Sequence, residues 1–312
     1  MTARKIIIDT DPGQDDAVAL LLAMASPELD ILGITVVAGN VPLALTEVNT
    51  RKVCELAGRS DIPVYAGCDA PLERPLVTAE HVHGKTGLDG ADLPEPTMRL
   101  QDRHAVDFII DTIRNSDPGQ ITLCPLGPLT NIAEALTRAP DITAKIAEIV
   151  LMGGGYFEQG NITPSAEFNI YVDPEAAKIV FGAGVKLTVI PLDCTHKALT
   201  NPARVKAFRL LGTPVGDAVA GLTDFFERFD KEKYGSVGAP LHDPCVIAYL
   251  LQPDLFQGRF INVEIETASQ LTLGSTVADW WRVSGRKPNA TFIRDIDDEG
   301  FFTLLTERLG RL

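Results

Sequence analysis

The chain has 312 residues, of which 45% are hydrophobic and 22% charged, a composition typical of globular proteins. Its formal net charge of −14 leaves little room for a large basic patch. This acidity disfavours nucleic-acid binding and favours a metal ion or a neutral or cationic small molecule as the partner. No stretch approaches the roughly 18 apolar residues of a membrane span, so we expect no membrane association.

The cysteines are scattered, odd in number and without a C-x-x-C pair, and most have apolar neighbours. This pattern is typical of buried, reduced thiols rather than of a disulfide framework. The first ten residues contain no apolar signal core. We therefore expect a cytoplasmic protein with reduced thiols at Cys54, Cys68, Cys124, Cys194 and Cys245.

Strand-like and helix-like stretches alternate through most of the chain, as judged from apolar runs and helical spacing of apolar residues. Residues 69–103 show little periodicity, and so long a loop in a compact domain is usually functional or a lid. The predicted strands span 6–8, 30–40, 62–67, 121–127, 148–155, 185–193, 259–267 and 290–296, and the predicted helices 44–56, 104–114, 130–136, 174–181, 201–233, 242–251 and 300–309.

This alternation predicts an α/β fold, a mostly parallel open sheet with helices on both faces (Rossmann-like). The chain has no internal repeat, low-complexity segment or linker, so residues 1–312 are expected to form a single large domain. Ligands of such sheets bind outside the carboxyl ends of the strands. Polar or glycine-rich segments should therefore meet at one edge: Asp9-Thr10-Asp11, Gly39-Asn40, Pro125-Leu126-Gly127, Gly153-Gly154-Gly155 and Asp193.

The strongest local signal is residues 5–22, KIIIDTDPGQDDAVALLL. The isoleucines predict a strand buried on both faces, and Pro12-Gly13 ends it. A helix then begins, where unpaired N–H groups and the helix dipole favour carboxylates. A solvated acidic loop with an ordinary N-cap is one interpretation. A hard divalent cation is the other, because it would neutralise the four carboxylates crowded at this turn: Asp9, Asp11, Asp15 and Asp16.

Two further segments concentrate polar side chains. In residues 160–169, Asn161, Glu167 and Asn169 offer amide and carboxylate groups that suit vicinal hydroxyls, although Asn also favours ordinary turns. His242-Asp243-Pro244 opens a helix and could supply a proton donor and a metal ligand, or be a surface pair.

Several histidines and aromatic residues have open roles in the sequence. His83 and His196 are loop residues that could be ligands, proton relays or merely exposed side chains. We assign Trp280-Trp281 and the cluster Phe225, Phe226 and Phe229 to packing, while Phe229 or Tyr234 could also stack on a base.

Taken together, these motifs resemble those of the inosine–uridine-preferring nucleoside hydrolase family over nearly the whole chain. The most specific is D-x-D-P-G-x-D-D, here DTDPGQDD at 9–16. One departure is Gln14, where bacterial relatives often carry His. The supporting motifs follow in order: VAGN at 37–40, HGKTGLDG at 83–90, LMGGG at 151–155, PSAEFNIYVDPEAA at 164–177 and HDP at 242–244.

The resemblance implies hydrolysis of the N-glycosidic bond of ribonucleosides, whether pyrimidine, purine or both, to ribose and free base. It also implies one Ca²⁺ per active site and a homo-oligomer, a tetramer or dimer. Ca²⁺ would be held by the carboxylates of Asp11, Asp16 and Asp243 and the backbone carbonyl of Leu126. Asp11 would also be the general base, and His242 the proton donor to the leaving base. The implied substrate-binding residues are Asp15, Asn40, Asn161, Glu167 and Asn169 at the ribose hydroxyls, with Phe168, and His83 and Tyr234 near the base.

Two other functions remain open from the acidic turn. A haloacid-dehalogenase-like phosphatase also binds a divalent cation after its first strand, but it leaves the 161–169 segment unexplained. A calcium-dependent nucleoside-binding protein without catalysis is the second alternative. Release of ribose from a nucleoside would distinguish the hydrolase from both.

Overall fold

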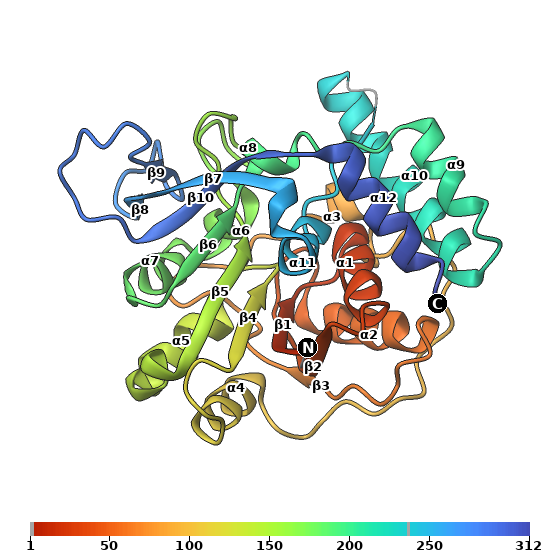
Figure 1. The fold of residues 1–312 in the computed structure, drawn as a ribbon, viewed down its shortest axis with the longest axis horizontal. Helices are drawn as coiled ribbons and strands as arrows, with labels where there is room; N and C mark the ends of the chain where they lie inside the picture. The colour runs from red at the N-terminus through yellow and green to blue at the C-terminus, as the bar shows by residue number, and fades with distance from the viewer. Residues whose placement is uncertain (1–2, 236–237) are drawn as a thin grey trace.

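The computed structural model describes residues 3–235 and 238–312. Their central feature is an eight-stranded sheet with the order β3-β2-β1-β4-β5-β6-β10-β7, in which only the β10–β7 pair is antiparallel (Figure 1). Its strands are β1 (Arg4–Thr10), β2 (Leu29–Val36), β3 (Val64–Ala66), β4 (Ile121–Pro125), β5 (Ile146–Met152), β6 (Leu187–Ile190), β7 (Phe256–Ile261) and β10 (Ala290–Ile296). A separate hairpin pairs β8 (Val263–Ile265) with β9 (Thr276–Ala278).

Strand β1 lies inside the sheet and is covered on both faces. Ile6, Ile7 and Ile8 are completely inaccessible to solvent. Ile6 and Ile8 belong to one hydrophobic cluster and Ile7 to the other, because successive side chains of a strand point to opposite faces. Burial on both sides explains the continuous apolar run in the sequence.

Helices cover both faces of the sheet. The cluster that contains Ile6 and Ile8 is completed by α1 (Gln14–Met24), α2 (Leu43–Leu56), α9 (Pro202–Arg209), α10 (Pro214–Tyr234), α11 (Pro244–Leu251) and α12 (Asp298–Leu309). The other is completed by α4 (Ala105–Arg114), α5 (Thr130–Arg138) and α7 (Pro174–Gly182). The shorter helices are α3 (Glu80–His83), α6 (Phe168–Val172), α8 (Leu192–Thr195) and the 3₁₀ turns Pro140–Lys145 and Pro253–Leu255. The predicted α/β fold with a mostly parallel sheet is confirmed.

The strand order creates a natural crevice at the carboxyl end of β1. From β1 the sheet extends through β2 and β3 on one side and through β4, β5 and β6 on the other. Where the strand order reverses in this way, the connecting loops diverge and leave space for a ligand. The acidic turn after β1 opens into this crevice.

Three sequence predictions of elements need correction. The predicted strand 259–267 is two strands, because the Val263 N–H donates to the Asn289 side chain and the chain leaves the main sheet to pair with β9. The predicted helix 201–233 is two helices, separated by left-handed Gly212 and by Thr213, which caps α10. The loop 69–103 contains the short helix α3. Within residues 3–235 and 238–312, no helix combines the length and apolarity needed to cross a bilayer.

Candidate active site

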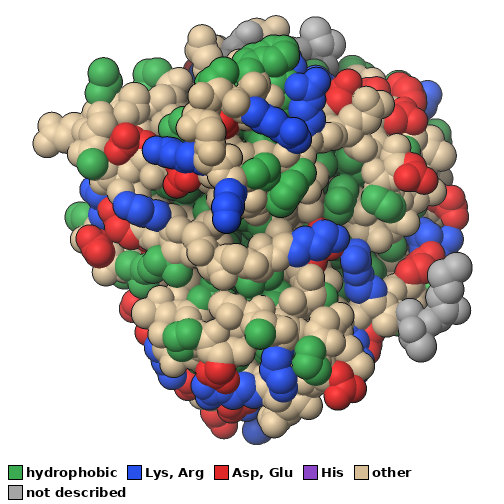
Figure 2. All heavy atoms as spheres, turned by 60° about the vertical axis from the view of Figure 1, so that its left-hand side comes forward, with side chains coloured by type: hydrophobic (Ala, Val, Ile, Leu, Met, Phe, Trp, Pro, Cys, Tyr) green, Lys and Arg blue, Asp and Glu red, His purple; other side chains and the backbone are tan. Residues whose placement is uncertain are grey.

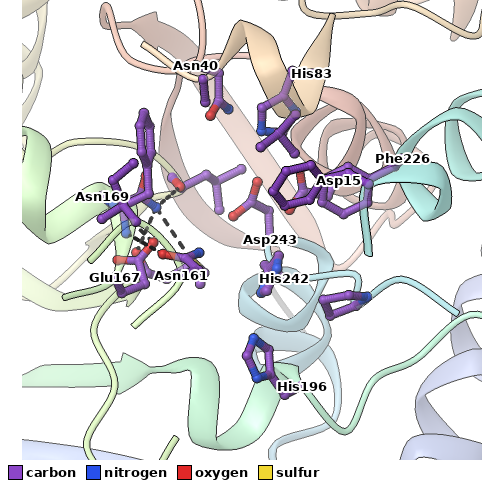
Figure 3. A pocket seen from close by; sticks show the side chains of 18 of the residues that line it. Asp15, Asn40, His83, Asn161, Glu167, Asn169, His196, Phe226, His242 and Asp243 are labelled. Atoms are coloured by element: carbon purple, nitrogen blue, oxygen red, sulfur yellow. Dashed lines mark hydrogen bonds between the residues drawn. The ribbon is translucent and has the colours of Figure 1, made fainter. Parts of the chain in front are cut away.

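A pocket at the carboxyl edge of the sheet gathers most of the predicted site residues (Figure 3). Asp11 and Asp16 are completely buried and are not among the lining side chains. Tyr234 is the last residue of α10, and its side chain lies outside the part of the chain that the structure describes. The predicted residues that line the pocket are Asp15, Asn40, His83, Leu126, Asn161, Glu167, Phe168, Asn169, His242 and Asp243.

The start of α1 organises the acidic end of the pocket. Asp16 is the third residue of α1 and accepts hydrogen bonds from the Gly13 N–H (2.9 Å) and the Thr10 hydroxyl (2.6 Å). This arrangement satisfies one of the unpaired N–H groups at the helix start. Carboxylate oxygens of Asp15, Asp16 and Asp243 lie within 4.8 Å of one another. Asp243, which directly precedes α11, thus completes a cluster that begins 228 positions earlier in the chain, at Asp15.

Asp11 sits in a tight cradle between two loops. A Cβ atom at Gly39 or Gly127 would collide with its carboxylate oxygens, so only glycine leaves room for the side chain. Its Oδ2 accepts the Asn40 N–H at 2.7 Å. Its Oδ1 is buried and has no hydrogen-bond partner among the described residues. An unpaired buried carboxylate oxygen is costly, and it marks a place for a cation or a proton.

Burial and mutual repulsion disfavour the charged forms of these carboxylates. Burial, followed by repulsion from Asp16, raises the pKa of Asp15 to about 8. The same two causes raise the pKa of Asp11 well above its ordinary value. Burial and the neighbouring Asp15 do the same to the pKa of Asp243. A bound cation would reverse these shifts, because it stabilises the ionised forms.

Asp9 is not part of the Asp15–Asp16–Asp243 cluster and has its own hydrogen-bond partners. Its Oδ1 accepts hydrogen bonds from the Thr35 hydroxyl (2.5 Å) and the Asn131 amide (2.8 Å). These contacts join β1 to β2 and α5 and agree with a supporting role for Asp9 behind the site.

The second wall of the pocket carries amides and a carboxylate. Glu167 caps α6 and accepts hydrogen bonds from the backbone N–H groups of Asn169 and Gly154, each at 2.9 Å. Burial raises the pKa of Glu167 to about 7. The side-chain amide of Asn169 donates to the backbone carbonyl of Leu126 at 2.6 Å, and the side-chain Oδ1 of Asn161 accepts the Phe168 N–H at 2.9 Å. The segment 161–169 is therefore folded onto the strand ends, with polar atoms facing the pocket.

The opposite end of the pocket is built from histidine and phenylalanine rings. The His83 ring stacks on Phe226 with centroids 5.5 Å apart, and Phe226 meets His242 edge-on at 6.4 Å. The ring centroids of His242 and His196 are 5.8 Å apart, and the His242 Nδ1 atom is 2.7 Å from the Thr195 hydroxyl. Figure 3 shows His83 and Asn40 on one side of the cavity and His242 and His196 on the other.

Sequence reasoning missed part of this end. The sequence predicts a packing role for Phe226, yet its ring lines the pocket between His83 and His242. His81 and Met152 also line it. Phe229, which could stack on a base, is a lining residue and lies 5.7 Å from the His81 ring. Helical spacing gave no signal for Phe226, because a ring that closes a pocket and a core ring occupy the same face of α10.

Comparisons with known proteins agree on one family. The family model described as "Inosine-uridine preferring nucleoside hydrolase" matches residues 6–303. An uncharacterized protein of Schizosaccharomyces pombe is 53% identical over 308 residues, covering 99% of both chains. The pyrimidine-specific ribonucleoside hydrolase RihA of Salmonella arizonae is 50% identical over 308 residues, covering 98% of both. The structure of a purine-preferring ribonucleoside hydrolase from Gardnerella vaginalis has a TM-score of 0.92 at 32% identity, covering 98% of both.

Fold, site and matches together define an enzyme that hydrolyses N-ribosyl bonds. More narrowly, the chain belongs to the inosine–uridine-preferring nucleoside hydrolase family. The resemblance found in the motifs is confirmed, and a dehalogenase-like phosphatase is excluded.

Proposed function

We propose that this hydrolase acts on pyrimidine ribonucleosides and depends on Ca²⁺ at the acidic cluster. The observation that carries the proposal is the two-ended pocket. Buried carboxylates and amides lie at one end, and rings of His83, Phe226 and His242 at the other. A nucleoside is divided in the same way: its hydroxylated sugar matches the end with carboxylates and amides, and its flat base matches the end with the rings. The pyrimidine preference is supported by the RihA relative, which is 50% identical.

The donor set at the acidic end fits Ca²⁺. Hard divalent cations prefer carboxylate and carbonyl oxygens, and the orphaned Asp11 Oδ1 together with the Asp15–Asp16–Asp243 cluster leaves negative charge uncompensated. We assign the ion to the carboxylates of Asp11, Asp16 and Asp243 and to the Leu126 carbonyl, which has a second lone pair beside its bond from Asn169. When bound, Ca²⁺ would neutralise the cluster and orient a water molecule and the ribose hydroxyls.

The remaining polar groups would hold the ribose. Asp15, Asn40 and Glu167 line the pocket, as do Asn161 and Asn169. Each ribose hydroxyl donates and accepts, so it pairs well with neighbouring carboxylate and amide groups. As the glycosidic bond breaks, positive charge develops on the sugar, and these carboxylates and amide oxygens stabilise it.

Proton transfers at the two sides of the scissile bond complete the mechanism. We assign the proton from the attacking water to Asp11 Oδ1, which has no hydrogen-bond partner among the described residues, whereas Oδ2 accepts the Asn40 N–H. We assign to His242 the transfer of a proton to the leaving base, from the ring nitrogen opposite the one near Thr195. Burial lowers the pKa of His242 well below its ordinary value, so the ring is neutral before reaction, and negative charge that develops on the leaving base favours its protonation. Such acid and base steps each contribute about 10²–10⁴-fold to rate.

A panel of ribonucleosides tests this function. Purified enzyme is mixed with uridine, cytidine, inosine or adenosine, and ribose is measured with a reducing-sugar assay. We expect ribose from uridine and cytidine at a kcat/KM at least tenfold above that for the purine nucleosides. Faster release from inosine would overturn the pyrimidine preference. Nucleoside binding without ribose release would support the non-catalytic alternative.

We also propose that the enzyme is a homo-oligomer, a tetramer or dimer. Support comes from exposed hydrophobic side chains near the β8–β9 hairpin: Phe260 (54% exposed), Trp281 (69%) and Val283 (86%). Figure 2 brings this end of the molecule forward and shows hydrophobic side chains scattered among Lys and Arg. Where such side chains form a contiguous apolar patch, a partner often covers it. Sedimentation equilibrium should give a multiple of the 33.7 kDa chain mass, and Trp281→Ser should shift the equilibrium towards monomer.

A cytoplasmic location is a further part of the proposal. All five cysteines are free thiols in the structure, and four of them are buried. Burial raises the pKa of Cys54 to about 12, which keeps this thiol protonated and inert. Proteins of oxidising compartments more often pair their cysteines. Cell fractionation of the native producer, followed by an antibody to the chain, tests the location.

A further inference from the structure

Gln14 occupies a position that the proposed mechanism leaves without a role. It is the first residue of α1, it is 1% exposed, and it directly precedes the acidic pair Asp15-Asp16. Its side chain reaches across to the segment 83–89, about 70 positions later in the chain. A buried amide whose every polar atom has a partner orders the groups around it.

The hydrogen bonds of Gln14 determine which way its amide points. The Nε2 group donates to two backbone carbonyls, those of His83 (2.9 Å) and Asp89 (3.0 Å). A backbone carbonyl only accepts, so these contacts must be made by the NH₂ group. The Gln14 Oε1 atom is thereby directed at His83 Nδ1, 2.7 Å away.

An amide oxygen only accepts, so His83 Nδ1 must carry the ring proton in this pair. Burial lowers the pKa of His83 to about 4, so the ring is neutral at pH 7 and carries a single N–H. Its Nε2 then has a free lone pair. The ring is also held in place, because it stacks on Phe226 and because a Cβ at Gly13 would collide with Nδ1.

We propose that Gln14 is a positioning residue that fixes His83 in the Nδ1–H tautomer, so that His83 Nε2 accepts a hydrogen bond from an N–H group of the substrate base. The imide N–H of uracil is a donor of this kind. The inference rests on the proposed function, in which His83 lies at the base end of the pocket. A tautomer fixed in advance lowers the cost of ordering this contact on binding.

Asn49 supplies a matched control for the anchoring of the same segment. Its Nδ2 group donates to the Pro12 (3.1 Å) and Thr86 (2.7 Å) carbonyls, and so it also ties the 83–89 segment to the acidic turn. It makes no bond to the His83 ring in the described part of the chain. Asn49→Leu therefore weakens only the anchoring of the 83–89 segment. Gln14→Met weakens this anchoring and also removes the acceptor that keeps the proton of the His83 ring on Nδ1.

The tautomer is measured directly by ¹H–¹⁵N correlation of the ring nitrogens in enzyme labelled at its five histidines. The His83 signals are assigned by their loss in His83→Gln. Wild type and Asn49→Leu should show a protonated Nδ1 and an unprotonated Nε2 at His83, and Gln14→Met should show a changed ratio. A wild-type His83 with its proton on Nε2 would overturn the proposal.

Kinetics give the second readout. In Gln14→Met the KM for uridine should rise about tenfold, while inhibition by free ribose, which reports the sugar end alone, should change less than twofold. The proposal would be overturned if Asn49→Leu raised the KM for uridine as much as Gln14→Met does. It would also be overturned if Gln14→Met weakened inhibition by ribose as much as it weakened uridine binding. Either result would mean that Gln14 only anchors the loop. If wild type releases no ribose at all, the proposed function fails, and the spectra still decide the tautomer.

Discussion

The two ends of the pocket are built by different means. The acidic end is formed where strands end and helices begin. Its side chains are held by backbone N–H groups, as the Gly13 N–H holds Asp16, and they occupy space that glycines leave free, as Gly39 does for Asp11. The other end, to which we assign the base, is formed by contacts between side chains of distant segments: His83 from α3, Phe226 from α10 and His242 before α11. The first end is specified locally and tightly. The second depends on how distant segments dock.

The difference predicts that single changes at the acidic end are the most damaging. Asp11→Asn should lower kcat for uridine by about 10³-fold, because it removes both the proposed base and a ligand charge. Ribose release by the purified variant measures the loss. Asp117→Asn, an exposed carboxylate beside Gln120 at the amino end of β4, is the control and should behave as wild type. Near-normal turnover by Asp11→Asn would remove the role assigned to this residue.

At the base end the effect should depend on the leaving group. His242→Ala should lower kcat for uridine by about 10²-fold, whereas p-nitrophenyl riboside, whose leaving group needs no proton, should be cleaved nearly as well as by wild type. His104→Asn, far away at the start of α4, keeps a cap and serves as control. Equal losses on both substrates would mean that His242 is not chiefly the acid.

A smaller effect is expected from the stacking ring. Phe226→Leu should raise the KM for uridine by about tenfold, since an aromatic contact is worth roughly 0.5–1.5 kcal/mol beyond its area. Inhibition by ribose should stay constant. The neighbouring Phe225→Leu is the matched control, because the Phe225 ring faces Arg228 and does not line the pocket. If the two variants behave alike, Phe226 only packs, as the sequence suggested.

The smallest expected effect is on stability and concerns the buried carboxylates without metal. Folding raises the pKa of Glu167 from 4.5 to about 7 and that of Asp15 from 3.8 to about 8. Between pH 4 and 8 the native state then binds more protons than the unfolded state, so the free energy of unfolding falls as pH rises. In EDTA, the melting temperature should drop by a few degrees from pH 5 to pH 8. Added Ca²⁺ should stabilise the protein more at pH 8, and a rise of the metal-free melting temperature with pH would contradict this account.

The contrast between the ends also explains what the sequence could reveal. The α/β fold and the acidic turn were predictable, because isoleucine runs, Pro12-Gly13 and clustered carboxylates act over a few residues. The contact between Gln14 and His83 was not predictable, because 69 positions separate the two residues. In addition, helix α3 has only four residues, too few for a helical spacing of apolar residues to be recognised. The division of residues 259–267 depended on the distant Asn289 side chain. Contacts between segments that are far apart in the sequence leave no pattern in the residues of either segment.

A cation bound at the buried carboxylates is the central requirement of the proposed activity. The direct measurement is ribose release from uridine against free Ca²⁺, with enzyme stripped by EGTA and the ion then added back. We predict less than about 1% of full activity in stripped enzyme, saturable recovery with Ca²⁺, and a higher Ca²⁺ requirement in Asp16→Asn, which keeps the side-chain volume but removes a ligand charge. Full activity in the stripped enzyme would contradict the central claim.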